Sequence, residues 1–107
     1  MLEISTSQER NYYIISLEGE LDASTSLKLD TAIQDALQQN ATKLVINLEK
    51  LQYVSSSGLG VFISYLSDFE AKGVYFSLLN AKDNILNTLT ILGLEKLVPL
   101  IYQIPDE

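Results

Sequence analysis

The sequence contains no cysteine and no histidine. Without cysteine there can be no disulfide framework and no thiolate chemistry. Without histidine the chain lacks the commonest general base and the commonest metal ligand, which excludes a Ser-His-Asp mechanism. No apolar run approaches the roughly 20 residues that span a bilayer, and the start of the chain lacks the basic and apolar regions of a secretory signal. We therefore expect a cytoplasmic protein with no membrane association.

Basic residues are also scarce. Seven lysines and arginines stand against 14 acidic residues, which gives a formal net charge of −7. A surface of this sign repels nucleic acid and anionic lipid, so neither is expected as a direct partner, and a basic or mixed protein surface is favoured. With 47% apolar and 20% charged residues, the chain has the composition of a compact protein. We expect one domain over residues 1–107.

The first part of the chain predicts a β-hairpin followed by a helix. Residues 2–5 alternate apolar and polar side chains, and residues 12–17 are rich in β-branched and aromatic ones, so both segments indicate strands. Ser24 or Thr25 can cap the helix, and Asn40 suits its end. Its apolar stripe consists of Leu29, Ile33, Ala36 and Leu37.

Two further segments, residues 43–48 and 74–79, are short and apolar, which is typical of strands covered on both faces. A helix between them ends at Gly73. Its apolar stripe, which should cover the sheet, consists of Leu59, Phe62, Ile63, Leu66 and Phe69. The sheet residues predicted in or near the core are Tyr13, Ile15, Val45, Ile46 and Phe76.

A third helix is expected to start at Asn80, with Asp83 three residues on, and to stop at Gly93. Its apolar face consists of Ile85, Leu86, Leu89 and Leu92. Residues 98–102 can add a last short strand, which Pro99 would confine to an edge of the sheet. The order ββαβαβα predicts an α/β domain with a mostly parallel mixed sheet packed against helices.

A run of three serines stands between the third strand and the second helix. Residues 53–60 read Tyr-Val-Ser-Ser-Ser-Gly-Leu-Gly and fall at the carboxyl edge of the sheet, where open α/β folds place their working sites. One reading is helix capping by a serine hydroxyl. A nucleophile elbow is excluded, because Val54 stands at the position of its first glycine and no histidine is present. The pattern also lacks the third glycine of a dinucleotide loop and the Gly-Lys-Ser/Thr ending of a P-loop.

The other open reading is a serine that receives a phosphate. A hydroxyl on an exposed turn at a helix N-terminus is accessible to a kinase, and the helix dipole tolerates the added charge. The local sequence alone does not decide between capping and phosphorylation. No spaced cluster of carboxylates is present for a metal ion.

Three segments together resemble one family. Residues 19–25 (Gly-Glu-Leu-Asp-Ala-Ser-Thr), 44–48 and 53–61, with Leu-Gly-Leu at 92–94, resemble the STAS domain of bacterial anti-sigma factor antagonists. The resemblance runs over essentially the whole chain. It implies a protein that, when unphosphorylated, binds an anti-sigma factor that is also a serine kinase, and thereby frees a sigma factor. Phosphorylation by that kinase releases the antagonist, and a serine phosphatase resets it. The resemblance implies no enzymatic activity and no cofactor.

The resemblance also assigns residues. The implied phosphoacceptor is Ser56, with Ser57 as the second candidate and Asp22 across a cleft in the first βα loop. Ser55 stands where the family has an aspartate. The expected partner-binding surface consists of Asp22, Ala23, Ser24, Thr25, Ser55, Ser56, Ser57, Gly58 and Gly60, with the two glycines allowing close approach to the backbone. The alternative is a STAS interaction or scaffold module that binds a regulatory partner without being phosphorylated.

Overall fold

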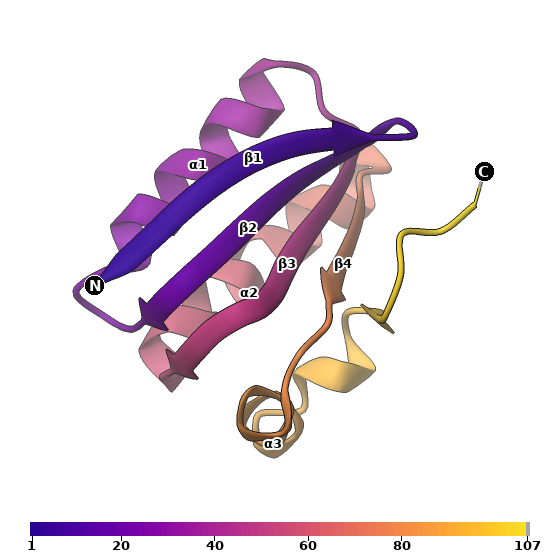
Figure 1. The fold of residues 1–107 in the computed structure, drawn as a ribbon. Coiled ribbons are helices and arrows are strands. Elements are labelled where there is room, and N and C mark those ends of the chain that lie inside the picture. The colour runs from indigo at the N-terminus through magenta and orange to yellow at the C-terminus, as the bar shows by residue number, and fades with distance from the viewer. Residues whose placement is uncertain (107) are drawn as a thin grey trace.

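A five-stranded mixed sheet with helices packed against it forms the protein (Figure 1). The structure, a computed structural model, describes residues 1–106. The strands lie in chain order: β1 (Leu2–Glu9), β2 (Tyr12–Leu21), β3 (Lys43–Val54), β4 (Tyr75–Leu79) and β5 (Leu100–Ile101). Only β1 runs antiparallel to its neighbour, and the other neighbouring pairs are parallel. The predicted fold class and the edge position of the last strand are confirmed.

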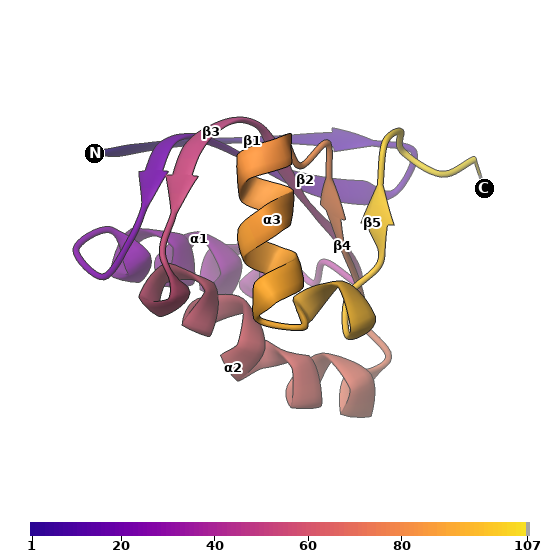
Figure 2. The same ribbon diagram turned by 90° about the horizontal axis from the view of Figure 1, so that it is seen from below.

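The helices are α1 (Ser26–Gln38), α2 (Ser56–Lys72) and α3 (Asp83–Ile91), followed by a short 3₁₀ helix, η1 (Leu94–Lys96). Helices α1 and α2 lie against the same face of the sheet, whereas α3 stands at one end of it (Figure 2). The hairpin between β1 and β2 turns through Arg10 and Asn11, both with positive φ, as a tight two-residue hairpin turn requires. None of the helices formed by residues 1–106 is long and apolar enough to cross a membrane.

The main core lies between the sheet and the helices. Alternate residues of the central strands point into it, and the predicted core residues Tyr13, Ile15, Ile46 and Phe76 are buried there. Val45 is also buried, but it belongs to a second, smaller cluster with Tyr12, Ile14 and Leu79. Two side chains near the C-terminus, Ile101 and Ile104, pack on this second cluster. The second face of the central strands is therefore covered in part, around Ile14 and Val45, whereas Glu18 and Glu49 are exposed.

The predicted register of α2 is partly wrong. Leu59, Phe62 and Phe69 are buried as expected, but Ile63 is 46% exposed. Tyr65, which was not assigned to the core, is 8% exposed. The reason is that α2 is apolar around much of its circumference, so that periodicity alone does not select one stripe. Packing against α1 determines which side of α2 is buried, because the Tyr65 hydroxyl forms hydrogen bonds with Asp30 and Gln34 of α1.

Helix ends agree well with the sequence signals. Gly73 and Gly93, and also Asn40, have positive φ directly after or within two residues of a helix, as left-handed terminating residues do. The third helix begins at Asp83, with Lys82 as its N-cap, which is three residues later than the expected start at Asn80. Asn80 itself has a positive φ and lies directly after β4. Its predicted apolar face is wrong at Leu92, which is 40% exposed because α3 already ends at Ile91.

Candidate functional site

The two loops that carry the candidate residues lie next to each other at the carboxyl edge of the sheet. Strands β2 and β3 are parallel neighbours, and their last residues, Leu21 and Val54, are paired in the ladder. The backbone N–H of Ser55 then donates a hydrogen bond to the carbonyl oxygen of Leu21 at 2.9 Å. The structure thus brings the loop after β2 and the serine turn after β3 together, as expected for neighbouring parallel strands.

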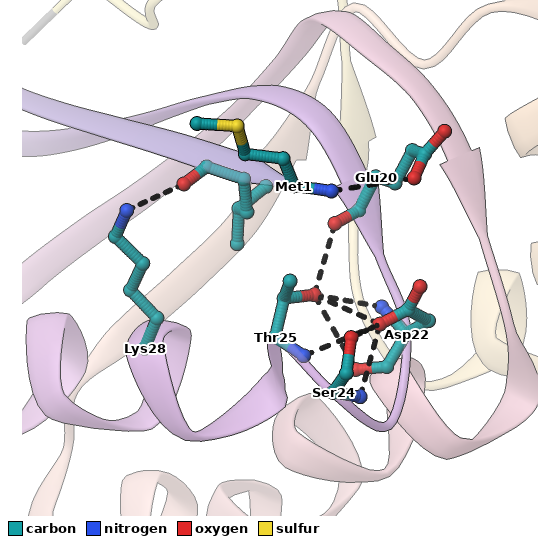
Figure 3. A network of polar contacts seen from close by, with 7 residues as sticks. Met1, Glu20, Asp22, Ser24, Thr25 and Lys28 are labelled. Atoms are coloured by element: carbon teal, nitrogen blue, oxygen red, sulfur yellow. Dashed lines mark hydrogen bonds and ion pairs between the residues drawn. The ribbon is translucent and has the colours of Figure 1, made fainter.

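Asp22 holds the first loop in a fixed shape (Figure 3). Its Oδ1 accepts hydrogen bonds from the Ser24 hydroxyl at 2.7 Å and from the backbone N–H groups of Ser24 at 3.0 Å and Thr25 at 3.2 Å. The bond from the Ser24 hydroxyl is the largest of the effects that lower the pKa of Asp22 below its ordinary value. Asp22 therefore supplies a negative charge at neutral pH.

Thr25 does not cap α1 with its side chain. It occupies the residue before the helix, but its hydroxyl accepts a hydrogen bond from the backbone N–H of Asp22 and donates one to the carbonyl oxygen of Glu20, both at 2.9 Å. The side chain thus ties the loop together from inside. Ala23 and Ser24 are exposed on the loop surface, whereas Thr25 is half-buried.

Gly19 fixes how this loop leaves the sheet, a role that was not foreseen. It has φ of +111°, and a Cβ at this position would lie 2.3 Å from the carbonyl oxygen of Met1. The backbone N–H of Glu20 donates to the same oxygen at 2.9 Å, while the Glu20 carboxylate lies 3.3 Å from the Met1 ammonium (Figure 3). Lys28 of α1 adds a bond of 2.6 Å to the carbonyl oxygen of Leu2. These contacts involve residues far apart in sequence, so no local pattern could have revealed them.

The three serines of the turn play different parts. Ser55 is the N-cap of α2: its backbone is extended, and its hydroxyl oxygen accepts a hydrogen bond from the backbone N–H of Gly58 at 3.1 Å. Ser56 and Ser57 are the first two residues of the helix, and both are exposed. Within residues 1–106 their hydroxyls have no hydrogen-bond partner. The capping role therefore belongs to Ser55 and leaves the other two hydroxyls available.

The two glycines also differ. Gly58 is buried, and a Cβ on it would lie 2.7 Å from the carbonyl oxygen of Leu21 and 2.8 Å from the Leu21 Cγ. Its missing side chain allows α2 to pack closely on the end of β2, so we assign Gly58 an internal role in place of the expected partner contact. Gly60 is exposed, and nothing lies within 4 Å of the position of a Cβ there. Of these two glycines, Gly60 is the one that offers an open backbone at the surface.

The serine turn has no basic residue close to it in the sequence. No lysine or arginine lies within five residues of Ser56, and Asp22 is the ionised group of the neighbouring loop. Residues 1–106 contain no cluster of three or more acidic, histidine or cysteine side chains that could hold a metal ion. What the edge offers is a set of exposed hydroxyls beside a fixed carboxylate.

Comparison with known proteins agrees with this architecture. The family model for the STAS domain matches residues 3–106. The fold is that of a STAS domain, and the chain belongs to this family.

Relatives within the family are anti-sigma factor antagonists, a class of regulatory proteins. The chain is 30% identical over 100 residues to the anti-sigma F factor antagonist of Paenibacillus polymyxa, which covers 92% of this chain and 86% of the relative. It is 29% identical over 97 residues to the anti-sigma-B factor antagonist of Staphylococcus aureus, covering 91% and 90%.

Solved structures of one such antagonist, SpoIIAA, are similar in both of its phosphorylation states. Its unphosphorylated form is 25% identical, with a TM-score of 0.70 and coverage of 96% of this chain and 90% of that one. The phosphorylated form from Bacillus is 26% identical, with a TM-score of 0.68 and coverage of 92% and 90%.

Proposed function

We propose that the protein binds an anti-sigma factor with serine-kinase activity when it is unphosphorylated, and that phosphorylation of Ser56 releases this partner. The observation that carries the proposal is the state of Ser56: an exposed hydroxyl at the first residue of α2, without a hydrogen-bond partner among residues 1–106 and beside the loop of Asp22. The relatives support it, because they are anti-sigma factor antagonists and SpoIIAA exists in an unphosphorylated and a phosphorylated form.

Ser56 is preferred over its neighbours for physical reasons. The Ser55 oxygen is engaged by the Gly58 N–H, so a kinase would have to break the helix cap to use it. Ser57 is exposed as well, but it lies one residue further into the helix. Ser56 also occupies the family position two residues before Gly58. We therefore assign the phosphate to Ser56 and keep Ser57 as the control.

The modification would act through charge at this edge. The kinase transfers the γ-phosphoryl group of ATP to the Ser56 oxygen, the hydroxyl proton leaves, and ADP is the second product. The phosphate adds a charge of roughly −1.5 to −2. It joins the ionised Asp22 on a chain of net charge −7, with no basic residue within five positions to pair with it. Repulsion and bulk at the interface, rather than internal refolding, would then release the partner.

The proposed partner surface consists of the half-buried Asp22 and the exposed residues of both loops: Ala23, Ser24, Ser56, Ser57 and Gly60. Gly60 tests this surface independently of the phosphate. Gly60→Arg places a long side chain in open space, so the variant should fold and lose the partner. A folded Gly60→Arg variant with full affinity would remove this surface from consideration.

Titration calorimetry with the purified kinase and four variants tests the switch. Ser56→Ala should bind like the unmodified protein, and it should stay bound in the presence of ATP because it cannot be phosphorylated. Ser56→Asp should bind at least about tenfold more weakly, which corresponds to roughly 1.4 kcal/mol. The matched pair Ser57→Ala and Ser57→Asp should change affinity less. Equal weakening by aspartate at both positions would contradict the assignment of the switch to Ser56.

A second function is favoured by one feature, the neutral cap. Ser55 supplies no charge beside the acceptor, whereas the family has an aspartate there. A STAS module that binds a regulatory partner without being phosphorylated would need no such charge. The test mixes the purified kinase with this chain and with a known substrate of the kinase. Tight binding to this chain without phosphate transfer, while the known substrate is phosphorylated many times over, would establish this alternative.

A further inference from the structure

One face of α2 is free of charge although it is exposed to solvent. Between Leu51 and Ser67 the chain has no charged residue, in a sequence with 7 basic and 14 acidic ones. The solvent-facing side of a surface helix ordinarily carries charged or polar residues, and α1 has exposed Lys28 and Asp35. On α2 up to Ser67 the exposed residues are four serines, Gly60 and Ile63, so this side is polar in part but carries no charge. Depletion of charged side chains is a mark of the central part of protein–protein interfaces.

An apolar groove lies at the end of this uncharged face. It has a volume of about 610 Å³ and is lined by residues of α2 and of the segment around η1. These two segments lie on the same side of the molecule in Figure 2. Ile63 lines it from α2 and is 46% exposed, and Leu97 lines it from the residue after η1 and is 62% exposed. Glu70 and Lys96 lie on its border, with charges of opposite sign. An apolar floor with a charged border is the composition of an interface core and its rim.

The groove continues the surface that carries Ser56. Ser56, Gly60 and Ile63 are separated by four and three residues, so they share one face of the helix. At a rise of 1.5 Å per residue, Ile63 lies about 10 Å along the axis from Ser56. A standard interface buries about 800 Å² on each partner, a patch about 30 Å across. One partner seated over Ser56 therefore reaches the groove, and Gly60 between them presents no side chain to obstruct it.

We propose that this groove receives apolar side chains of the same anti-sigma factor kinase that binds over Ser56, and that Ile63 and Leu97 are anchor residues of that interface. The inference rests on the proposed function and extends its surface by two turns of α2. The groove contacts lie away from the phosphate, so they contribute affinity in both states of Ser56. The partner would also cover the uncharged face between Ser56 and Ile63 and exclude water from it.

The experiment measures the dissociation constant of the purified kinase for Ile63→Ser and Leu97→Ser by calorimetry. Both side chains are exposed, so their truncation should leave the urea midpoint nearly unchanged. Ile91→Ser is the matched control, because Ile91 is 73% exposed on α3 and does not line the groove. Each groove variant should bind about fivefold more weakly or worse, and the control should bind like the unmodified chain.

Three outcomes would overturn the inference in distinguishable ways. Groove variants that bind normally while Gly60→Arg loses the partner would refute the groove and leave the proposed function intact. Full binding by Gly60→Arg and Ser56→Asp as well would refute the proposed function itself. A change in the self-association of the chain, with no change in kinase affinity, would assign the groove to a second copy of the protein instead.

Discussion

The same substitution at two glycines only two residues apart should have clearly different effects on stability. Both Gly58 and Gly60 lie within α2, where alanine is favoured over glycine by about 1 kcal/mol. Gly60 has open space at the position of a Cβ, so Gly60→Ala should raise the free energy of unfolding by about that amount. Gly58 has no such space.

The cost at Gly58 follows from its neighbours. A Cβ there would lie 2.7 Å from the carbonyl oxygen and 2.9 Å from the carbonyl carbon of Leu21, so the end of β2 must move by about 0.7 Å to reach the 3.4 Å of ordinary contact. The same carbonyl accepts the Ser55 N–H, so that bond is strained too. Overpacking of this kind costs about 1–3 kcal/mol, which leaves Gly58→Ala neutral to about 2 kcal/mol less stable than the unmodified chain.

Urea unfolding followed by circular dichroism measures the difference. The helix-propensity contribution is common to both variants, so the gap between their free energies of unfolding isolates the clash with Leu21, at about 1–3 kcal/mol. Equal midpoints for the two variants at equal m values would refute the close packing of α2 on β2. A Gly58→Ala variant more stable than Gly60→Ala would refute it more strongly.

Two further predictions concern the core. Phe62 is fully buried, so Phe62→Ala should lower the free energy of unfolding by about 3–5 kcal/mol, and an unchanged urea midpoint would reject its place in the core. Burial, followed by the hydrogen bond to Asp30 and its charge, raises the pKa of Tyr65 to about 12 from its ordinary value of 10.0. The stability that this protonated hydroxyl contributes is complete below pH 10 and is lost as the pH rises toward 12. Between pH 9 and pH 11.5 the urea midpoint of the unmodified chain should therefore fall further than that of Tyr65→Phe. Equal falls for the two proteins would show that the Tyr65 hydroxyl does not have this raised pKa.

The order of the elements was predictable because its signals are local. Each helix and strand has its own periodicity, and Gly73 and Gly93 end helices through a backbone conformation that glycine adopts readily. The adjacency of the two candidate loops also followed from the sequence, since neighbouring parallel strands bring their carboxyl ends together.

The exact faces were not predictable in the same way. Ile63 and Tyr65 lie two positions apart in an apolar stretch, and the choice between them depends on Asp30 and Gln34 of α1, which bond the Tyr65 hydroxyl at 2.6 and 2.7 Å. The side chain of Val45 points to the other face of the sheet and belongs to the second cluster, on which Ile101 and Ile104 pack. Such choices are made by tertiary contacts, which local patterns do not contain.

The same distinction applies within the site. Which serine hydroxyls stay exposed and unbonded depends on which of the three consecutive serines caps the helix, and the sequence allows each of them to do so. The contact of Ser55 with Gly58 resolves this, because it leaves Ser56 and Ser57 with free hydroxyls. Similarly, the sequence predicts the same role for Gly58 and Gly60. The structure shows that they differ, because Gly58 lies against Leu21 and Gly60 has open space around it.

Mapping of the phosphorylated residue tests the central claim most directly. The unmodified chain is incubated with its cognate kinase and ATP, and the peptide spanning residues 51–72 is fragmented by mass spectrometry. The account predicts one phosphate, on Ser56, with none transferred to the Ser56→Ala variant. A phosphate on Ser57, or on no serine at all, would contradict it.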